Sequence, residues 1–214
     1  MSLENVDFRV EYDEENSIAI PDMIGEDLSE AIDHGIIVSK LAFLLSKTLE
    51  MDEEFCYSLA KAGFVHDIGK LKLIKYLYGR KKDSLAIEEM RYIRMHPALG
   101  KEILIQYGYE ETIIETVYHH HENYDGTGYP ENLKGDDIPI GSRILRICDV
   151  FAALISERRY RSAFEVDTAI ELMIDEVKNF DMEVFLAFLL MVHSMEMKEI
   201  LNYVNIINKK YSYI

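Results

Sequence analysis

The chain has 214 residues, of which 49% are hydrophobic and 29% charged, the composition of a soluble globular protein with a sizeable core. No apolar run reaches the roughly 18 residues that a bilayer span needs, and the acidic N-terminus lacks a secretory signal. The two cysteines form no disulfide framework, so we expect a cytoplasmic protein without membrane insertion. The net charge of −16 argues against a DNA or RNA polymer as partner.

Negative charge is concentrated at the N-terminus. Residues 1–33 contain eleven acidic side chains and one arginine, so they carry −10 of the −16. The remainder contains local basic clusters, and a small anionic ligand is therefore compatible with the composition. We predict an acidic N-terminal extension at 1–25, a main domain at 26–208 and a C-terminal tail at 209–214.

The apolar spacing is helical along most of the chain. Residues 5–20 alternate weakly and predict a short hairpin, with Pro21 and Gly25 marking the join to the main domain. Helices are then predicted at 27–50, 53–67, 85–95, 97–107, 110–122, 139–157, 165–178 and 181–208. The apolar stripe of the first helix contains Leu28, Ile32, Ile36, Leu41, Leu45 and Thr48. The predicted fold class is all-α, an irregular helical bundle with a short N-terminal extension.

Six of the seven histidines fall in four local groups, each on or at the end of a predicted helix. The groups are Glu30 with His34, the His66-Asp67 pair, His96 before Pro97, and the run of histidines at 119–121. Asp149 lies inside an apolar helical segment, where a carboxylate is costly unless it is paired or binds a metal. His119 is expected to be a partly exposed residue at a helix end, and His193 a structural one.

Imidazole and carboxylate without thiolate form the ligand set of catalytic iron, manganese or zinc sites. The eight candidate ligands are Glu30, His34, His66, Asp67, His96, His120, His121 and Asp149. One tetrahedral ion takes four ligands, so this surplus predicts two or three divalent ions. Close metal pairs favour hydrolysis of phosphoryl esters, because both ions stabilise the oxygens around the reacting phosphorus.

Two segments carry a specific resemblance to a known family. His66-Asp67-Ile-Gly-Lys70 resembles the signature of the HD phosphohydrolase superfamily. The stretch from His120 to Glu122, followed by Asp125-Gly-Thr-Gly-Tyr-Pro130, resembles the diagnostic motif of its HD-GYP branch. The resemblance covers about residues 26–195 and implies an HD-domain helical bundle that hydrolyses cyclic di-GMP.

The resemblance also implies roles for single residues. The eight candidates above stand at metal-ligand positions, with Asp67 as the bridging carboxylate and Glu30 at the position that holds a third ion in some members. The ions implied are iron or manganese. His66, Asp67 and Lys70 would be catalytic, with Lys70 touching the scissile phosphate. Tyr129, Arg158 and Arg161 would bind substrate. A metal-activated hydroxide would then cleave cyclic di-GMP to linear pGpG or on to GMP.

Three alternatives remain open on the sequence. Segment 71–82 lacks the proline-containing turn that is usual in the family, which leaves room for another nucleotide substrate, such as a cyclic GMP-AMP or a phosphomonoester. A receptor or adaptor that binds cyclic di-GMP without turnover is a second alternative. A di-iron redox or oxygen-binding protein is a third, although Lys70, Arg158 and Arg161 would then have no evident role. The sequence does not identify a protein partner.

Overall fold

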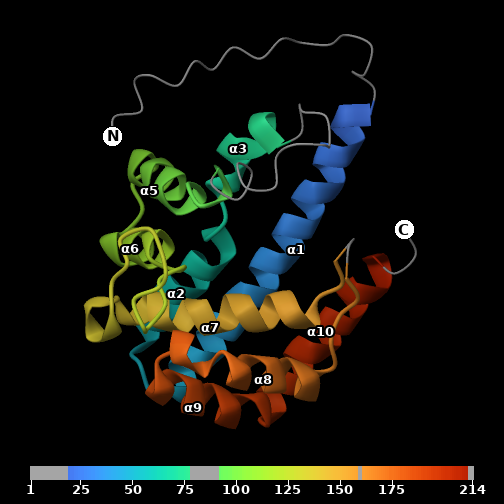
Figure 1. Cartoon of the computed structure of the whole chain (residues 1–214). Coiled ribbons are helices and arrows are strands. Elements are labelled where there is room, and N and C mark those ends of the chain that lie inside the picture. The colour runs from blue at the N-terminus through green and yellow to red at the C-terminus, as the bar shows by residue number, and fades with distance from the viewer. Residues whose placement is uncertain (1–18, 78–91, 159–160, 212–214) are drawn as a thin grey trace.

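The structure, a computed structural model, describes residues 19–77, 92–158 and 161–211 (Figure 1). Its α-helices are α1 (Ala19–Thr48), α2 (Glu53–Val65), α3 (Lys70–Leu77), α5 (His96–Gln106), α6 (Glu111–Tyr118), α7 (Ile140–Ile155), α8 (Val166–Asp175), α9 (Met182–Val192) and α10 (Met195–Tyr211). The described residues form no strand apart from one isolated bridge between Arg158 and Arg161, so the predicted all-α class is confirmed. Most of the predicted hairpin and of helix 85–95 lies outside the described residues.

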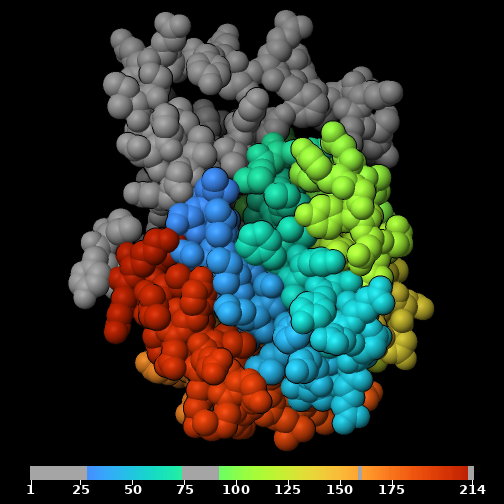
Figure 2. All heavy atoms as spheres, turned by 180° about the vertical axis from the view of Figure 1, so that it is seen from behind, coloured from blue at the N-terminus to red at the C-terminus, as the bar shows by residue number. Residues whose placement is uncertain are grey.

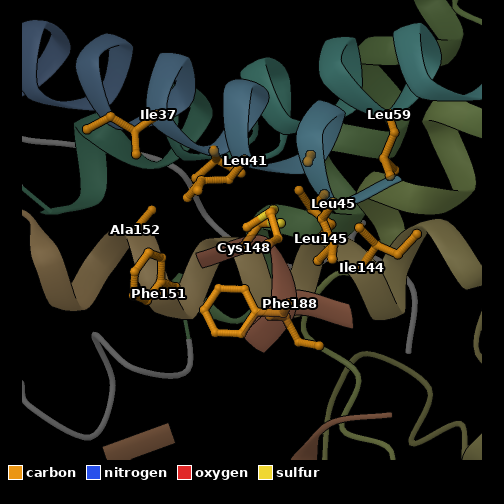
Figure 3. Packing of buried hydrophobic residues seen from close by; sticks show 14 of the residues in the cluster. Ile37, Leu41, Leu45, Leu59, Ile144, Leu145, Cys148, Phe151, Ala152 and Phe188 are labelled. Carbon is orange, nitrogen blue, oxygen red and sulfur yellow. The ribbon is translucent and has the colours of Figure 1, made fainter. Parts of the chain in front are cut away.

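Helices α1 and α7 form the centre of the domain, and α2, α6, α9 and α10 pack around them. From behind, α10 (red) lies beside α1 (blue) (Figure 2). The core lies where one face of α1 meets α7: Leu41 and Leu45 pack towards Cys148 and Phe151, and Phe188 of α9 closes the cluster from the other side (Figure 3). No helix among the described residues is both long and apolar enough to span a bilayer.

The structure corrects several boundaries. Helix α1 begins at Ala19, so Pro21 and Gly25 lie within it rather than before it. The predicted helix at 181–208 is two helices, because the chain breaks at Ser194, whose hydroxyl accepts the Met197 amide at the start of α10. Helix α10 continues to Tyr211, so part of the predicted tail is helical. Helix α3 was not predicted.

The predicted apolar stripe of α1 is only partly correct. Leu41 and Leu45 are buried, but Leu28 and Ile32 expose 41% and 43% of their surface. The buried face continues instead through Ile37, Val38 and Ala42.

Close packing of α1 on α2 depends on two glycines. A Cβ on Gly63 would lie 3.0 Å from the Ser39 backbone, and a Cβ on Gly35 would lie 2.7 Å from the Phe64 carbonyl oxygen. Because neither residue has a side chain, the two backbones approach closely just before the His66-Asp67 pair. This contact brings His34 of α1 towards the end of α2.

Candidate metal centre

Seven of the eight predicted ligands lie in two adjoining groups. Asp67, His96, His120 and His121 form the first group, and His34, His66 and Asp149 form the second. Within each group the potential ligand atoms all lie within 4.8 Å of one another. Ligands that share one ion at bond lengths near 2 Å are separated by up to about 4 Å, so small side-chain shifts would fit each group around one metal ion.

Asp67 joins the two groups. Its Oδ1 lies 3.2 Å from His96 Nε2 in the first group, and its Oδ2 lies 3.4 Å from His66 Nε2 in the second. Asp149 Oδ1 lies 3.5 Å from the same nitrogen of His66 and 3.0 Å from His34 Nε2. A carboxylate with one oxygen in each group is placed as a bridging ligand would be.

Three histidines are oriented by the backbone of the turn that precedes them. The Nδ1 atoms of His66, His96 and His120 lie 2.8, 2.7 and 2.6 Å from the carbonyl oxygens of the residues three positions earlier. Nδ1 must donate these bonds, so Nε2 of each ring is directed into the cluster and can coordinate an ion once it carries no proton. A hydrogen bond at the far ring nitrogen is the usual way in which a metal-binding histidine is held.

His34 is held differently. Its Nδ1 lies 3.4 Å from Nη2 of Arg158, whose other terminal nitrogen lies 3.2 Å from Oε1 of Glu30. Arginine can only donate, so Nδ1 of His34 accepts and Nε2 donates to Asp149. The Glu30 carboxylate pairs with a guanidinium and, among the described residues, belongs to neither group. The structure therefore does not place Glu30 as the predicted ligand of a third ion.

Burial and charge favour a cation at this site. Burial lowers the pKa of His96 to about 4 and that of His121 to about 3, so both rings are neutral and able to coordinate. Burial also lowers the pKa of His66, but Asp67 and Asp149 outweigh it and raise that pKa to about 10. The negative field that holds a proton on His66 would equally favour a divalent cation in its place.

Two unpaired atoms mark the centre of the cluster. His66 Nε2 and Asp67 Oδ1 are buried without a hydrogen-bond partner within the described part of the chain. Leaving such atoms unsatisfied costs about 1–3 kcal/mol each, and metal coordination would satisfy both. Imidazoles with two carboxylates and no thiolate fit a divalent ion such as iron or manganese. The cluster is therefore suited to bind metal.

Gly69 allows the turn that carries His66 to pack closely against the segment that carries His96. A Cβ at this position would lie 2.0 Å from the His96 carbonyl oxygen and 2.7 Å from the Gly100 nitrogen, distances that no side chain tolerates. Gly69 lies in the turn between α2 and α3, and the missing side chain lets that turn pack against the start of α5, which carries His96.

The glycine-rich loop at 125–130 is fixed next to the cluster by Glu122. This buried carboxylate accepts the amides of Glu131 at 2.7 Å and Leu133 at 3.1 Å. Tyr129 stacks on the His121 ring with 4.8 Å between centroids. The guanidinium carbon of Arg94 lies 5.2 Å from the centroid of the same Tyr129 ring. The loop thus forms one wall of the site.

The predicted substrate residues are not all at the cluster. Lys70 Nζ lies 2.6 Å from Asp67 Oδ2, and Arg158 contacts His34, so both border the cluster. Arg161 instead donates to the carbonyls of Ala153, Leu154 and Ser162 and lies over the Phe164 ring. Those bonds tie the chain to the end of α7, so of the three basic residues predicted to contact substrate only Lys70 and Arg158 border the cluster.

Two other features differ from the sequence analysis. His119 was expected to be partly exposed, but only 4% of it is, because its Nε2 pairs with Glu115 at 3.2 Å and its ring packs on Tyr118. Arg146 was not assigned a role, yet its charge acts on both Asp149 and His121. Its position three residues before Asp149 on α7 was the signal for this, since that spacing places both on one helix face.

The fold and the site together define a class of protein: an all-helical domain with a buried histidine–aspartate cluster suited to metal ions. The sequence model of the HD domain family matches residues 19–184. The chain therefore belongs to the HD domain family, and the resemblance to its HD-GYP branch is confirmed.

Three curated relatives show how near the likeness is. The chain is 32% identical to the cyclic di-GMP phosphodiesterase PA4108 of Pseudomonas aeruginosa, over 72% of this chain and 37% of the relative. It is 35% identical to the cyclic di-GMP phosphodiesterase response regulator RpfG of Xanthomonas campestris, over 62% and 35%. It is 34% identical to the 3'3'-cGAMP-specific phosphodiesterase 3 of Vibrio cholerae, over 65% and 30%. The chain thus spans about a third of the length of these relatives.

Solved structures share the fold. The HDG"Y"P protein Bd1817 of Bdellovibrio bacteriovorus superposes with a TM-score of 0.59 at 20% identity, covering 81% of this chain and 56% of that one. The HD domain of the phosphodiesterase PgpH of L. monocytogenes gives 0.51 at 18% identity, covering 91% and 99%.

Proposed function

We propose that the chain is a metal-dependent phosphodiesterase that hydrolyses a cyclic dinucleotide, with cyclic di-GMP as substrate and linear pGpG or GMP as product. The observation that carries the proposal is the position of Asp67, whose two carboxylate oxygens face histidines of both groups. The two ions would be held by His34, His66, Asp67, His96, His120, His121 and Asp149. Bound there, divalent ions supply an activated water and stabilise the charge on phosphoryl oxygens.

The protein's own residues would bind and orient the substrate. Lys70 and Arg158 border the cluster and carry positive charge, which attracts a phosphodiester in spite of the net charge of the chain. The forked guanidinium of Arg158 is suited to two phosphate oxygens at once. Tyr129 and Arg94 lie on the loop side, where a flat aromatic ring offers a surface for a purine base.

Relatives with two different substrates in their names bear on the choice of cyclic dinucleotide. PA4108 and RpfG are named for cyclic di-GMP, whereas three of the Vibrio cholerae relatives are named for 3'3'-cGAMP. We propose cyclic di-GMP first, with 3'3'-cGAMP as the second candidate. The two differ in one purine, so the residues that line the bases decide between them rather than the metal ligands.

The experiment is hydrolysis by the purified chain. Metal is removed with a chelator, Mn²⁺ or Fe²⁺ is restored, and the products from cyclic di-GMP and 3'3'-cGAMP are identified by chromatography. We expect turnover that depends on metal and is lost in Asp67→Asn. His193→Asn, which changes an exposed histidine outside the cluster, is the matched control. Metal binding without cleavage of either substrate would contradict the proposal and favour a receptor.

A further inference from the structure

The last two turns of α10 connect the two helices that hold one half of the metal centre. Tyr211 donates from its hydroxyl to Asp33 Oδ2 at 2.7 Å, and Lys210 Nζ lies 2.8 Å from the same oxygen. Lys210 also donates to Ser29 Oγ at 2.8 Å. These bonds hold the turn of α1 at residues 29–33, which contains Glu30 and directly precedes His34.

The same segment of α10 also holds the end of α7. Asn208 donates to the Ile155 carbonyl at 2.9 Å and accepts the Glu157 amide at 2.8 Å. Ile155 is the last residue of α7, the helix that carries Asp149, and Glu157 directly precedes Arg158. α10 (red) and α1 (blue) lie side by side in Figure 2. One short segment therefore fixes both elements that meet in the His34–Asp149 contact.

The HD domain match ends at residue 184, before α10 begins. We propose that Lys210, Tyr211 and Asn208 are positioning residues that brace His34 and Arg158 through Asp33 and the end of α7. The brace sets the metal affinity of the group formed by His34, His66 and Asp149. This inference rests on the proposed metal centre for its effect on affinity, but the brace itself does not.

The arrangement of these bonds explains why loss of the brace would change the metal affinity. The Asp33 side chain is 13% exposed, so its bond from Tyr211 is partly shielded from water, whereas Lys210 is half exposed. A charge-assisted pair in such a setting is stronger than one on an open surface. Asp33 and His34 are consecutive, so a shift of the Asp33 backbone moves the imidazole with it. Residues that orient a metal ligand change affinity by roughly 10- to 100-fold when they are removed.

The test uses the full chain with Mn²⁺ as the probe. Lys210→Ala/Tyr211→Phe removes the bonds of the brace to α1, Lys209→Ala removes an equal charge from the same turn, and Lys210→Arg keeps the pair with Asp33. By titration calorimetry after removal of metal, we expect one class of Mn²⁺ sites to weaken roughly tenfold in the double variant only. Both single variants should bind as the unaltered chain does. Equal affinities in all four proteins would overturn the proposal.

Hydrogen exchange of the metal-free proteins separates this inference from the proposed function. The amides of residues 30–34 should exchange faster in the double variant than in Lys209→Ala, with Lys210→Arg restoring protection. If the unaltered chain bound no Mn²⁺, the proposed metal centre would fail, and exchange alone would then decide whether the brace exists. No difference in exchange at 30–34 would refute the brace whatever the metal result.

Discussion

Asp149 and His34 lie 115 positions apart in the chain, yet their side chains meet with 3.0 Å between Oδ1 and Nε2. The contact joins α1 to α7 at the edge of the core, next to His66. It shows how the metal centre is built: the ligands come from α1, α5, α7 and the turns that follow α2 and α6, and the packing of these elements brings them together.

Replacing Asp149 tests the second group of ligands. Asp149→Asn keeps the size of the side chain but removes its charge, so His34 and His66 would share a much weaker ligand. We expect the metal content of the purified protein to fall by about one ion per chain, because three-ligand sites depend on each ligand. Elemental analysis measures this, with His193→Asn as the control. An undiminished metal content would remove Asp149 from the ligand set.

Replacing Glu30 distinguishes two ions from three. Its carboxylate pairs with Arg158 at 3.2 Å and lies outside both groups of the described residues. We therefore expect Glu30→Gln to leave the ratio of metal to protein unchanged. A loss of about one ion per chain, measured in the same way, would restore the three-ion site that the family resemblance implies.

The two arginines after α7 should behave differently. Arg158→Ala is expected to raise KM for the cyclic dinucleotide about tenfold, equivalent to about 1.4 kcal/mol of binding, while kcat changes little. Arg161→Ala should leave KM unchanged and lower the melting temperature, because three backbone carbonyls lose their donor. Steady-state kinetics and thermal unfolding give both answers. If Arg158→Ala left KM unchanged, the phosphate contact would be wrong.

Glu122 should control the loop that carries Tyr129. Glu122→Ala leaves the amides of Glu131 and Leu133 without an acceptor, at a cost of about 1–3 kcal/mol for each one that stays buried. Glu122→Gln keeps one carbonyl oxygen and should lose less stability. Urea unfolding of both variants measures the difference, and KM for substrate should rise in the same order. Equal stability of the two variants would show that the loop is held by other contacts.

Phe188 and Leu190 of α9 allow a core residue to be compared with a surface residue of the same helix. Phe188 is fully buried and lies 4.9 Å from Phe151 between ring centroids, whereas Leu190 exposes 73% of its surface. Phe188→Ala should lower the free energy of unfolding by about 3–5 kcal/mol through the cavity that it leaves. Leu190→Ala should change it by less than about 0.5 kcal/mol. A small effect at Phe188 would mean that the surrounding helices collapse into the space.

The sequence by itself determined what is local. Apolar spacing gave the helical class and most of the helix positions, because a period of 3.6 residues is visible within a short window. Ligand types on or near helix ends singled out His66, Asp67, His120 and His121 before any geometry was known. Boundaries were less accurate, as the break at Ser194 shows, because a side-chain cap restarts a helix within a continuous apolar pattern.

Only the tertiary structure decided which side chains contact one another. Glu30 and His34 have the spacing of a ligand pair, but Arg158, far away in sequence, lies close enough to take Glu30 as its own partner. Arg158 and Arg161 look alike in sequence, yet one faces the cluster and the other binds the end of α7. Spacing along a chain defines a helix face, whereas the partner of a charged side chain depends on distances that only the packing of separate helices sets.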